Sequence, residues 1–117
     1  MADQTASTGS TPVLYTYYRS SCSARVRIAL NWKGIPYDMR FIHLVKAEQR
    51  DPKYLKVNPG GLVPTLCIDG HTLQQSVAIL EYLEEAFTEK PLLPVDVVAR
   101  AKVRTLVNIV ACDIQPV

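Results

Sequence analysis

The order of the elements that turn residues separate is the feature that most constrains the fold of this chain. A β-branched and aromatic run at 13–17, an amphipathic stretch at 21–33 and a partly alternating run at 37–44 predict a strand, a helix and a strand. Gly34 and Pro36 end that helix. Because a helical crossover of this length joins parallel strands, the first two strands should be parallel. One face of the helix carries Val26, Ala29, Leu30 and Lys33.

An antiparallel hairpin and a second helix complete the pattern. Strands are predicted at 63–68 and 71–73, because the Asp-Gly pair between them is typical of a two-residue hairpin turn. A helix opens at 74–76 and runs to about residue 87. Pro64 cannot donate to a sheet ladder, so it should mark a strand edge. A strand-helix-strand unit joined to a strand-strand-helix unit predicts a thioredoxin-like α/β domain with a mixed four-stranded sheet.

Three segments organise the chain. Residues 1–12 are small, polar and almost uncharged, so we expect a disordered tail rather than a secretory signal. Residues 13–90 hold the α/β domain, and residues 91–117 hold a proline-rich linker and one more helix, expected from 95 to about 114. The apolar residues of that helix lie on more of its sides than a single packing partner would cover. Its surface indicates that the sequence is a fragment or that the helix docks on another subunit.

Composition excludes several classes of function. With 13 basic and 11 acidic residues among 117, the chain lacks the charge of a nucleic-acid binder, and its apolar runs are too short for a membrane span. Cys22, Cys67 and Cys112 are odd in number and widely separated, which argues against a disulfide framework or a zinc site. His43 and His71 have no partner at metal-ligand spacing, so we expect no metal. Reduced thiols favour a cytoplasmic protein. Cys67 and Cys112 are expected to be packing residues.

The stretch RSSCSARVRIAL at 19–30 is the first candidate site. A helix N-terminus offers free backbone N–H groups and partial positive charge, and serine hydroxyls add hydrogen-bond donors. Such a site lowers the pKa of a thiol and holds a thiolate. Two interpretations stay open: either Cys22 is a nucleophile itself, or the serines hold the thiolate of a ligand. In the plainer alternative, Ser20 or Ser21 only caps the helix.

Two further features point to a peptide ligand. The backbone of Val63, before Pro64 at a strand edge, could pair with an extended peptide as an added strand does. Gln75 and Ser76 open the second long helix, where a carboxylate is favoured. Each feature alone is equally an ordinary strand start or helix cap. Together, along one edge of the predicted sheet, they favour a small peptide that carries a thiol and carboxylates.

The motifs RSSCSARVRIAL, NPGGLVPTL and IDGHTLQQSVAILEYLEE closely resemble the N-terminal domain of glutathione transferases. The SSC start and the RVRIAL helix resemble the zeta class, also known as maleylacetoacetate isomerases. The end, AKVRTLVNIVACDIQPV, resembles the first helix of the all-helical C-terminal domain of that family, and the resemblance covers residues 13–117. It implies a cis bond between Val63 and Pro64. Ala24 departs from the family, which often has an aromatic residue there.

The resemblance implies roles for individual residues. Ser21 is expected to hydrogen-bond the glutathione sulfur, Val63 to pair with its cysteinyl backbone, and Gln49 to contact its glycine moiety. The catalytic residues would be Ser20, Ser21 and Cys22. The glutathione-binding residues would be Ser20, Ser21, Cys22, Ser23, Arg25, Gln49, Val63, Pro64, Gln75 and Ser76, the last two at the γ-glutamyl carboxylate. The substrate-binding residues would be Arg19, Arg25 and Gln115. Arg25 and Arg27 are alternatively a solvated helix face.

The implied activity is the glutathione-dependent cis–trans isomerisation of maleylacetoacetate to fumarylacetoacetate in tyrosine and phenylalanine catabolism. Transfer of glutathione to small electrophiles such as α-halo acids, and a homodimer, are also implied. Two alternatives compete with this interpretation. One is a thioredoxin- or glutaredoxin-like thiol oxidoreductase that uses Cys22, and the other is a truncated, inactive fragment that binds glutathione.

Overall fold

The computed structural model describes residues 11–43 and 46–114, except for the side chains of residues 112–114. The strands are β1 (Val13–Thr16), β2 (Asp38–Phe41), β3 (Thr65–Ile68) and β4 (His71–Gln74). The helices are α1 (Ser21–Trp32), α2 (Pro52–Val57), α3 (Ser76–Ala86) and α4 (Val97–Asn108). A 3-10 turn, η3 (Glu48–Arg50), precedes α2, and a π-helical segment, η4 (Ile109–Ile114), follows α4. None of the helices in these described ranges is long and apolar enough to cross a membrane.

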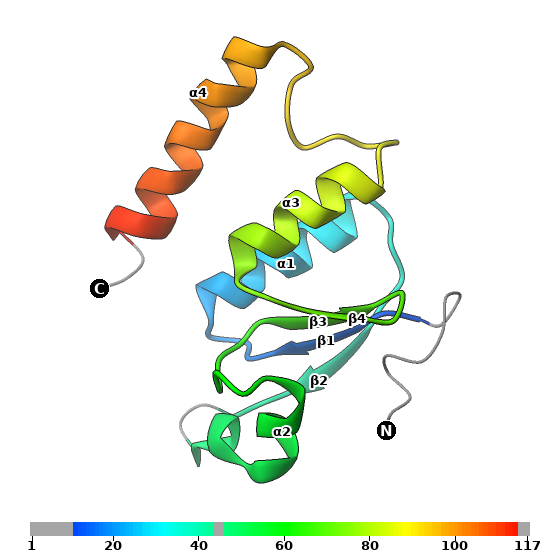
Figure 1. Ribbon diagram of the computed structural model, residues 1–117, viewed down its shortest axis with the longest axis vertical. Coiled ribbons are helices and arrows are strands. Elements are labelled where there is room, and N and C mark those ends of the chain that lie inside the picture. The colour runs from blue at the N-terminus through cyan, green and yellow to red at the C-terminus, as the bar shows by residue number, and fades with distance from the viewer. Residues whose placement is uncertain (1–10, 44–45, 115–117) are drawn as a thin grey trace.

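The four strands form one mixed sheet in the order β2-β1-β3-β4 (Figure 1). β1 is parallel to β2, as the helical crossover through α1 predicts, and it is antiparallel to β3. β3 and β4 form the antiparallel hairpin that the Asp-Gly pair indicated. The predicted thioredoxin-like arrangement is therefore confirmed.

Helices cover both faces of the central strands. α1 and α3 lie together on one face, and α2 lies on the other (Figure 1). Side chains alternate along β1, so Leu14 enters the core under α1 and α3, whereas Tyr15 packs against Tyr54 of α2. Cys67 in β3 is buried in the second cluster, which confirms its prediction as a packing residue.

Several predicted boundaries differ from the structure. β3 begins at Thr65 rather than at residue 63, because Pro64 has no N–H to contribute to the ladder. All four residues of β2 are exposed, although the sequence there alternates, because this strand is the outer edge of the sheet. The carbonyl of Pro12 accepts a hydrogen bond from the Asp38 N–H at 2.8 Å, so backbone pairing begins inside the predicted tail. Residues 1–10 of that tail lie outside the described residues.

The linker is held by a buried ion pair between α1 and α3. Lys33 Nζ lies 3.1 Å from Glu84 Oε1, with side chains only 1% and 7% exposed. Lys33 also donates to the carbonyls of Phe87 and Lys90, at 2.7 and 3.0 Å. The Glu84 carboxylate accepts hydrogen bonds from two linker N–H groups at 2.8 and 3.0 Å, those of Leu92 and Leu93.

The last helix packs on the domain by one side only. Arg104 of α4 pairs with Glu81 of α3 at 2.9 Å, and no residue of α4 is buried. The uninterrupted helix predicted from 95 to about 114 is instead α4 followed by π-helical turns. The apolar side chains that the sequence placed on several sides of this helix include the exposed Val97, Val98 and Leu106.

Candidate glutathione site

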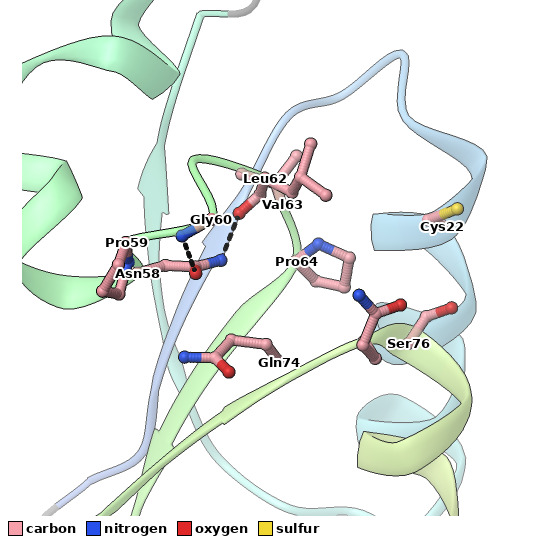
Figure 2. Close-up of a pocket in the computed structure, with 10 residues that line it drawn as sticks. Cys22, Asn58, Pro59, Gly60, Leu62, Val63, Pro64, Gln74 and Ser76 are labelled. Atoms are coloured by element: carbon pink, nitrogen blue, oxygen red, sulfur yellow. Dashed lines mark hydrogen bonds between the residues drawn. The ribbon is translucent and has the colours of Figure 1, made fainter.

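A groove of about 660 Å³ lies at one end of the sheet, between the start of α1, the loop before β3 and the start of α3. Its volume falls in the range of about 300–1,000 Å³ that is typical of small-molecule sites. Figure 2 shows Cys22, Pro64 and Ser76 around it, each from a different one of these segments. The lining residues are Cys22, Asn58, Pro59, Gly60, Leu62, Val63, Pro64, Gln74, Gln75 and Ser76.

The start of α1 gives each residue of the SSC motif a different environment. Ser20 is the N-cap, and its Oγ accepts a hydrogen bond from the Ser23 N–H at 3.1 Å. Ser21 is the first helical residue and is exposed. Cys22 is half-buried, and it is the only residue of the motif among those that line the groove. The sequence left two candidates for the cap, and the structure assigns that role to Ser20.

The loop before β3 presents an open backbone edge. The Val63–Pro64 bond is cis, as the family resemblance implied, and Val63 and Pro64 both line the groove. Among the residues that the structure describes, neither the N–H nor the carbonyl of Val63 has a hydrogen-bond partner. This edge can therefore accept an extended peptide.

Three buried polar side chains support this loop. Tyr54 of α2 and Asn58 each hydrogen-bond the Thr65 hydroxyl and donate to the carbonyl of Leu62, which the Thr65 hydroxyl also reaches at 3.4 Å. Asn58 Oδ1 accepts the Gly60 N–H at 2.9 Å, and both Asn58 bonds to the loop are drawn in Figure 2. Burial, the largest influence, raises the pKa of the Tyr54 hydroxyl above its ordinary value. Sequence reasoning missed this network.

The start of α3 is tied to α1. Ser76 is buried, and its Oγ accepts a hydrogen bond from Arg25 Nη1 at 3.0 Å. Gln75 precedes the helix with φ 72° and ψ 115°, and its exposed side chain makes no capping bond. A non-glycine residue rarely adopts such a φ, and strain of this kind gathers at binding sites. The first N–H groups of α3 remain suited to a carboxylate.

The other predicted site residues that the structure describes do not line the groove. Arg19 is exposed, with its guanidinium 5.5 Å from the centre of the Tyr18 ring. Ser23 is buried, and its Oγ has no partner among the described residues. Gln49 in η3 lines a neighbouring cavity. Gln115 lies outside the described residues.

The contacts of Arg27 contradict its interpretation as part of a solvated helix face. Its guanidinium donates to Thr16 Oγ1 at 2.5 Å and to the Tyr17 carbonyl at 3.4 Å. The interpretation of Arg27 as part of a solvated helix face is therefore wrong, because α1 lies back against β1. Arg25, for which the same alternative stood, bonds Ser76 instead.

Residues 14–91 match the family described as the glutathione S-transferase N-terminal domain, which is well over half of the chain. The chain belongs to the glutathione S-transferases. It is 58% identical over 107 residues to a probable maleylacetoacetate isomerase 2 of Drosophila melanogaster, covering 90% of this chain and 47% of that protein. It is 52% identical over 106 residues to a maleylacetoacetate isomerase of Dictyostelium discoideum, covering 89% and 48%.

Solved structures of zeta-class transferases share the fold. A bacterial maleylpyruvate isomerase in the zeta class superposes with a TM-score of 0.86 at 46% identity, over 89% of this chain and 49% of that one. A maleylacetoacetate isomerase of Methylobacterium extorquens AM1, solved with malonate and glutathione, gives 0.84 at 48% identity, with the same coverage. The resemblance to zeta-class transferases is thus confirmed. The chain spans about half the length of the curated relatives it matches.

Proposed function

We propose that this transferase domain binds glutathione in the groove and contributes the thiol-binding part of a maleylacetoacetate isomerase. The observation that carries the proposal is the meeting of three features in one groove: the start of α1 at Cys22, the unpaired edge at Val63, and the start of α3 at Ser76. The names of the curated relatives support the reaction, and the glutathione in a zeta-class neighbour supports the ligand.

The groove fits a γ-linked tripeptide with a thiol. The open N–H and carbonyl of Val63 match the extended cysteinyl backbone. The amide of Gln75 and the first N–H groups of α3 suit the γ-glutamyl carboxylate. Gln49, in the neighbouring cavity, is the proposed contact for the glycine moiety.

When bound, glutathione would supply a thiolate for addition to the conjugated cis double bond, and its elimination after rotation would leave the trans product and free thiolate. The N-terminal end of α1 favours the charged form of a thiol placed there, because its N–H groups and partial positive charge face an anion. Ser21 is the proposed donor to the sulfur, with Ser20, which caps the helix, and Cys22 beside it.

Positive charge for the carboxylates of the substrate is proposed to come from Arg19, and Gln115 is the proposed contact from the segment that follows α4. Arg25 acts indirectly, since its guanidinium holds Ser76. The same thiolate would displace halide from α-halo acids.

The cell setting is also a proposal. We place the protein in the cytoplasm because Cys22 and Cys67 are free thiols. We place it in tyrosine and phenylalanine breakdown because its relatives are named maleylacetoacetate isomerases, and the family resemblance implies that pathway. A homodimer is also proposed, because the resemblance to zeta-class transferases implies it.

Two measurements test the main proposal. Calorimetric titration should show saturable binding of glutathione to this chain, and maleylacetoacetate should isomerise only when glutathione is present. A second chain, extended to the full length of the relatives, separates binding from turnover. Binding without turnover in the extended chain would refute the isomerase assignment, and absence of binding in both would refute the glutathione site.

A thiol oxidoreductase that uses Cys22 is the second candidate, because that half-buried thiol lines the groove. It predicts a mixed disulfide between Cys22 and glutathione after incubation with oxidised glutathione. Intact-mass spectrometry distinguishes the two functions. A stoichiometric adduct at Cys22 together with disulfide reductase activity would favour the oxidoreductase.

A further inference from the structure

The carbonyl of Leu62 is held by two buried side chains, of which Asn58 also lines the groove and Tyr54 does not. The Tyr54 hydroxyl donates to it, and Asn58 Nδ2 donates to it at 3.0 Å. Thr65 Oγ1 lies 2.8 Å from the Tyr54 hydroxyl and 3.2 Å from Asn58 Nδ2. All three side chains are at least 95% buried, so these bonds form away from competing water.

This arrangement fixes the direction of the next N–H group. In a trans peptide the carbonyl and the N–H that follows it point in opposite directions. The only cis bond in the described part of the chain is Val63–Pro64, so the Leu62–Val63 peptide is trans. Because the Leu62 carbonyl points to the Tyr54 hydroxyl, which is not part of the groove lining, the Val63 N–H points the opposite way, toward the groove that Val63 lines.

Besides those donors, the Leu62 carbonyl has a longer bond from the Thr65 hydroxyl, at 3.4 Å, and the Gly61 N–H bonds the Asn58 carbonyl at 2.9 Å. The Leu62 side chain is 60% exposed and gives the peptide no anchor in the core. Gly60 and Gly61 precede it, and glycine permits backbone rotation that other residues resist. Asn58 restricts that freedom at a second point, through the Gly60 N–H.

We propose that Tyr54 and Asn58 are positioning residues that aim the Val63 N–H at the carbonyl of an extended thiol peptide in the groove. The proposal rests on the proposed function for its ligand, glutathione, and adds the residues that prepare the binding edge. The Tyr54 side chain does not line the groove, so it need not touch the ligand. Tyr54 and Asn58 act on the ligand site through the orientation of the Leu62–Val63 peptide group.

Tyr54→Phe is the sharpest test, because it removes one oxygen and keeps the buried ring. We expect glutathione to bind about tenfold more weakly by calorimetry, the loss of one buried hydrogen bond. Asn58→Ala, which removes the second donor, should act in the same direction. Tyr82→Phe is the matched control, since the Tyr82 hydroxyl contacts Asp69 in the β3–β4 turn, and it should leave the affinity unchanged.

A local readout separates positioning from general destabilisation. Amide hydrogen exchange is followed at saturating glutathione for Val63 and for Val77 at the start of α3. In the unmodified chain the ligand should slow exchange at both amides. In Tyr54→Phe the slowing at Val63 should fall about tenfold, while that at Val77 persists.

Each outcome bears on a different claim. If the unmodified chain binds no glutathione, the proposed function fails. If it binds and Tyr54→Phe shows the same affinity and the same slowing at Val63, the positioning role is overturned. Equal loss of slowing at Val63 and Val77 would also overturn it, because a general loosening of the domain would then explain the weaker binding.

Discussion

Arg25 in α1 donates a hydrogen bond to the hydroxyl of Ser76, the first residue of α3, with Nη1 3.0 Å from Oγ. The two residues are 51 positions apart in the chain, yet this bond joins the two helix starts that border the groove. It places a guanidinium next to the proposed carboxylate site without exposing it in the groove lining. Arg25 therefore supports the geometry of the site.

Replacing Arg25 by Gln should weaken glutathione binding about tenfold, because a hydrogen bond from a charged donor contributes about 1.5–3 kcal/mol and Ser76 loses its orientation. Calorimetric titration checks the loss. Arg104→Gln is the control, since that arginine pairs with Glu81 at the surface, away from the groove. Equal effects of the two substitutions would contradict the supporting role of Arg25.

The buried ion pair predicts a loss of stability when it is broken. Glu84→Gln leaves Lys33 buried without its anionic partner and weakens two linker bonds, so unfolding should cost about 3 kcal/mol less. Urea unfolding at neutral pH measures this. Glu85→Gln, at the exposed neighbouring position, should change stability little.

The same carboxylate predicts an acid-sensitive stability. Burial alone would raise the pKa of Glu84, but the N–H groups of Leu92 and Leu93 and the Lys33 ammonium lower it below its ordinary 4.5. Since the folded-state pKa is the lower one, the stabilisation is present above pH 4.5 and is lost as the pH falls through the folded-state pKa. Unfolding curves between pH 7 and pH 3 should show this loss in the unmodified chain. Glu84→Gln should lack it, and an equally steep acid loss in that variant would contradict the assignment.

Local patterns predicted the framework because each depends on neighbours in the sequence. The helical spacing of Val26, Ala29, Leu30 and Lys33 placed all four on the inner face of α1, and the Lys33 side chain is indeed buried. Pro64 marked the strand edge, because a proline lacks the N–H that a sheet ladder needs in any tertiary context.

Local sequence patterns did not predict the contacts between segments that are distant in the sequence. Arg27 on a helix face has the sequence signature of a solvated residue, but its bond to Thr16 depends on how α1 lies on β1. Tyr54 and Asn58 meet the Leu62 carbonyl only because the loop before β3 folds back over α2. The residues that hold a binding edge in place are therefore harder to predict than those that form it.

The SSC motif gives a prediction about which side chain serves the sulfur. Ser21→Ala should nearly abolish glutathione-dependent isomerisation, and Cys22→Ala should only weaken it, because a hydroxyl donor stabilises a thiolate whereas the thiol of Cys22 is a weak donor. Initial rates at saturating glutathione, in the chain extended to the length of its relatives, measure both effects. Full activity of Ser21→Ala, or equal and complete losses in both variants, would overturn the assignment.

The backbone of Gln75 provides the last prediction. At φ 72° a Cβ is strained, and removing it by Gln75→Gly should relieve about 1 kcal/mol relative to Gln75→Ala, which keeps the Cβ. Both variants lack the amide proposed to bind the γ-glutamyl carboxylate, so both should bind glutathione more weakly, by about tenfold. Urea unfolding and calorimetric titration of the pair separate the two effects. If the glycine variant is the more stable and both bind weakly, the strain at Gln75 is retained for the ligand rather than for the fold. An unchanged affinity in both variants would remove Gln75 from the site.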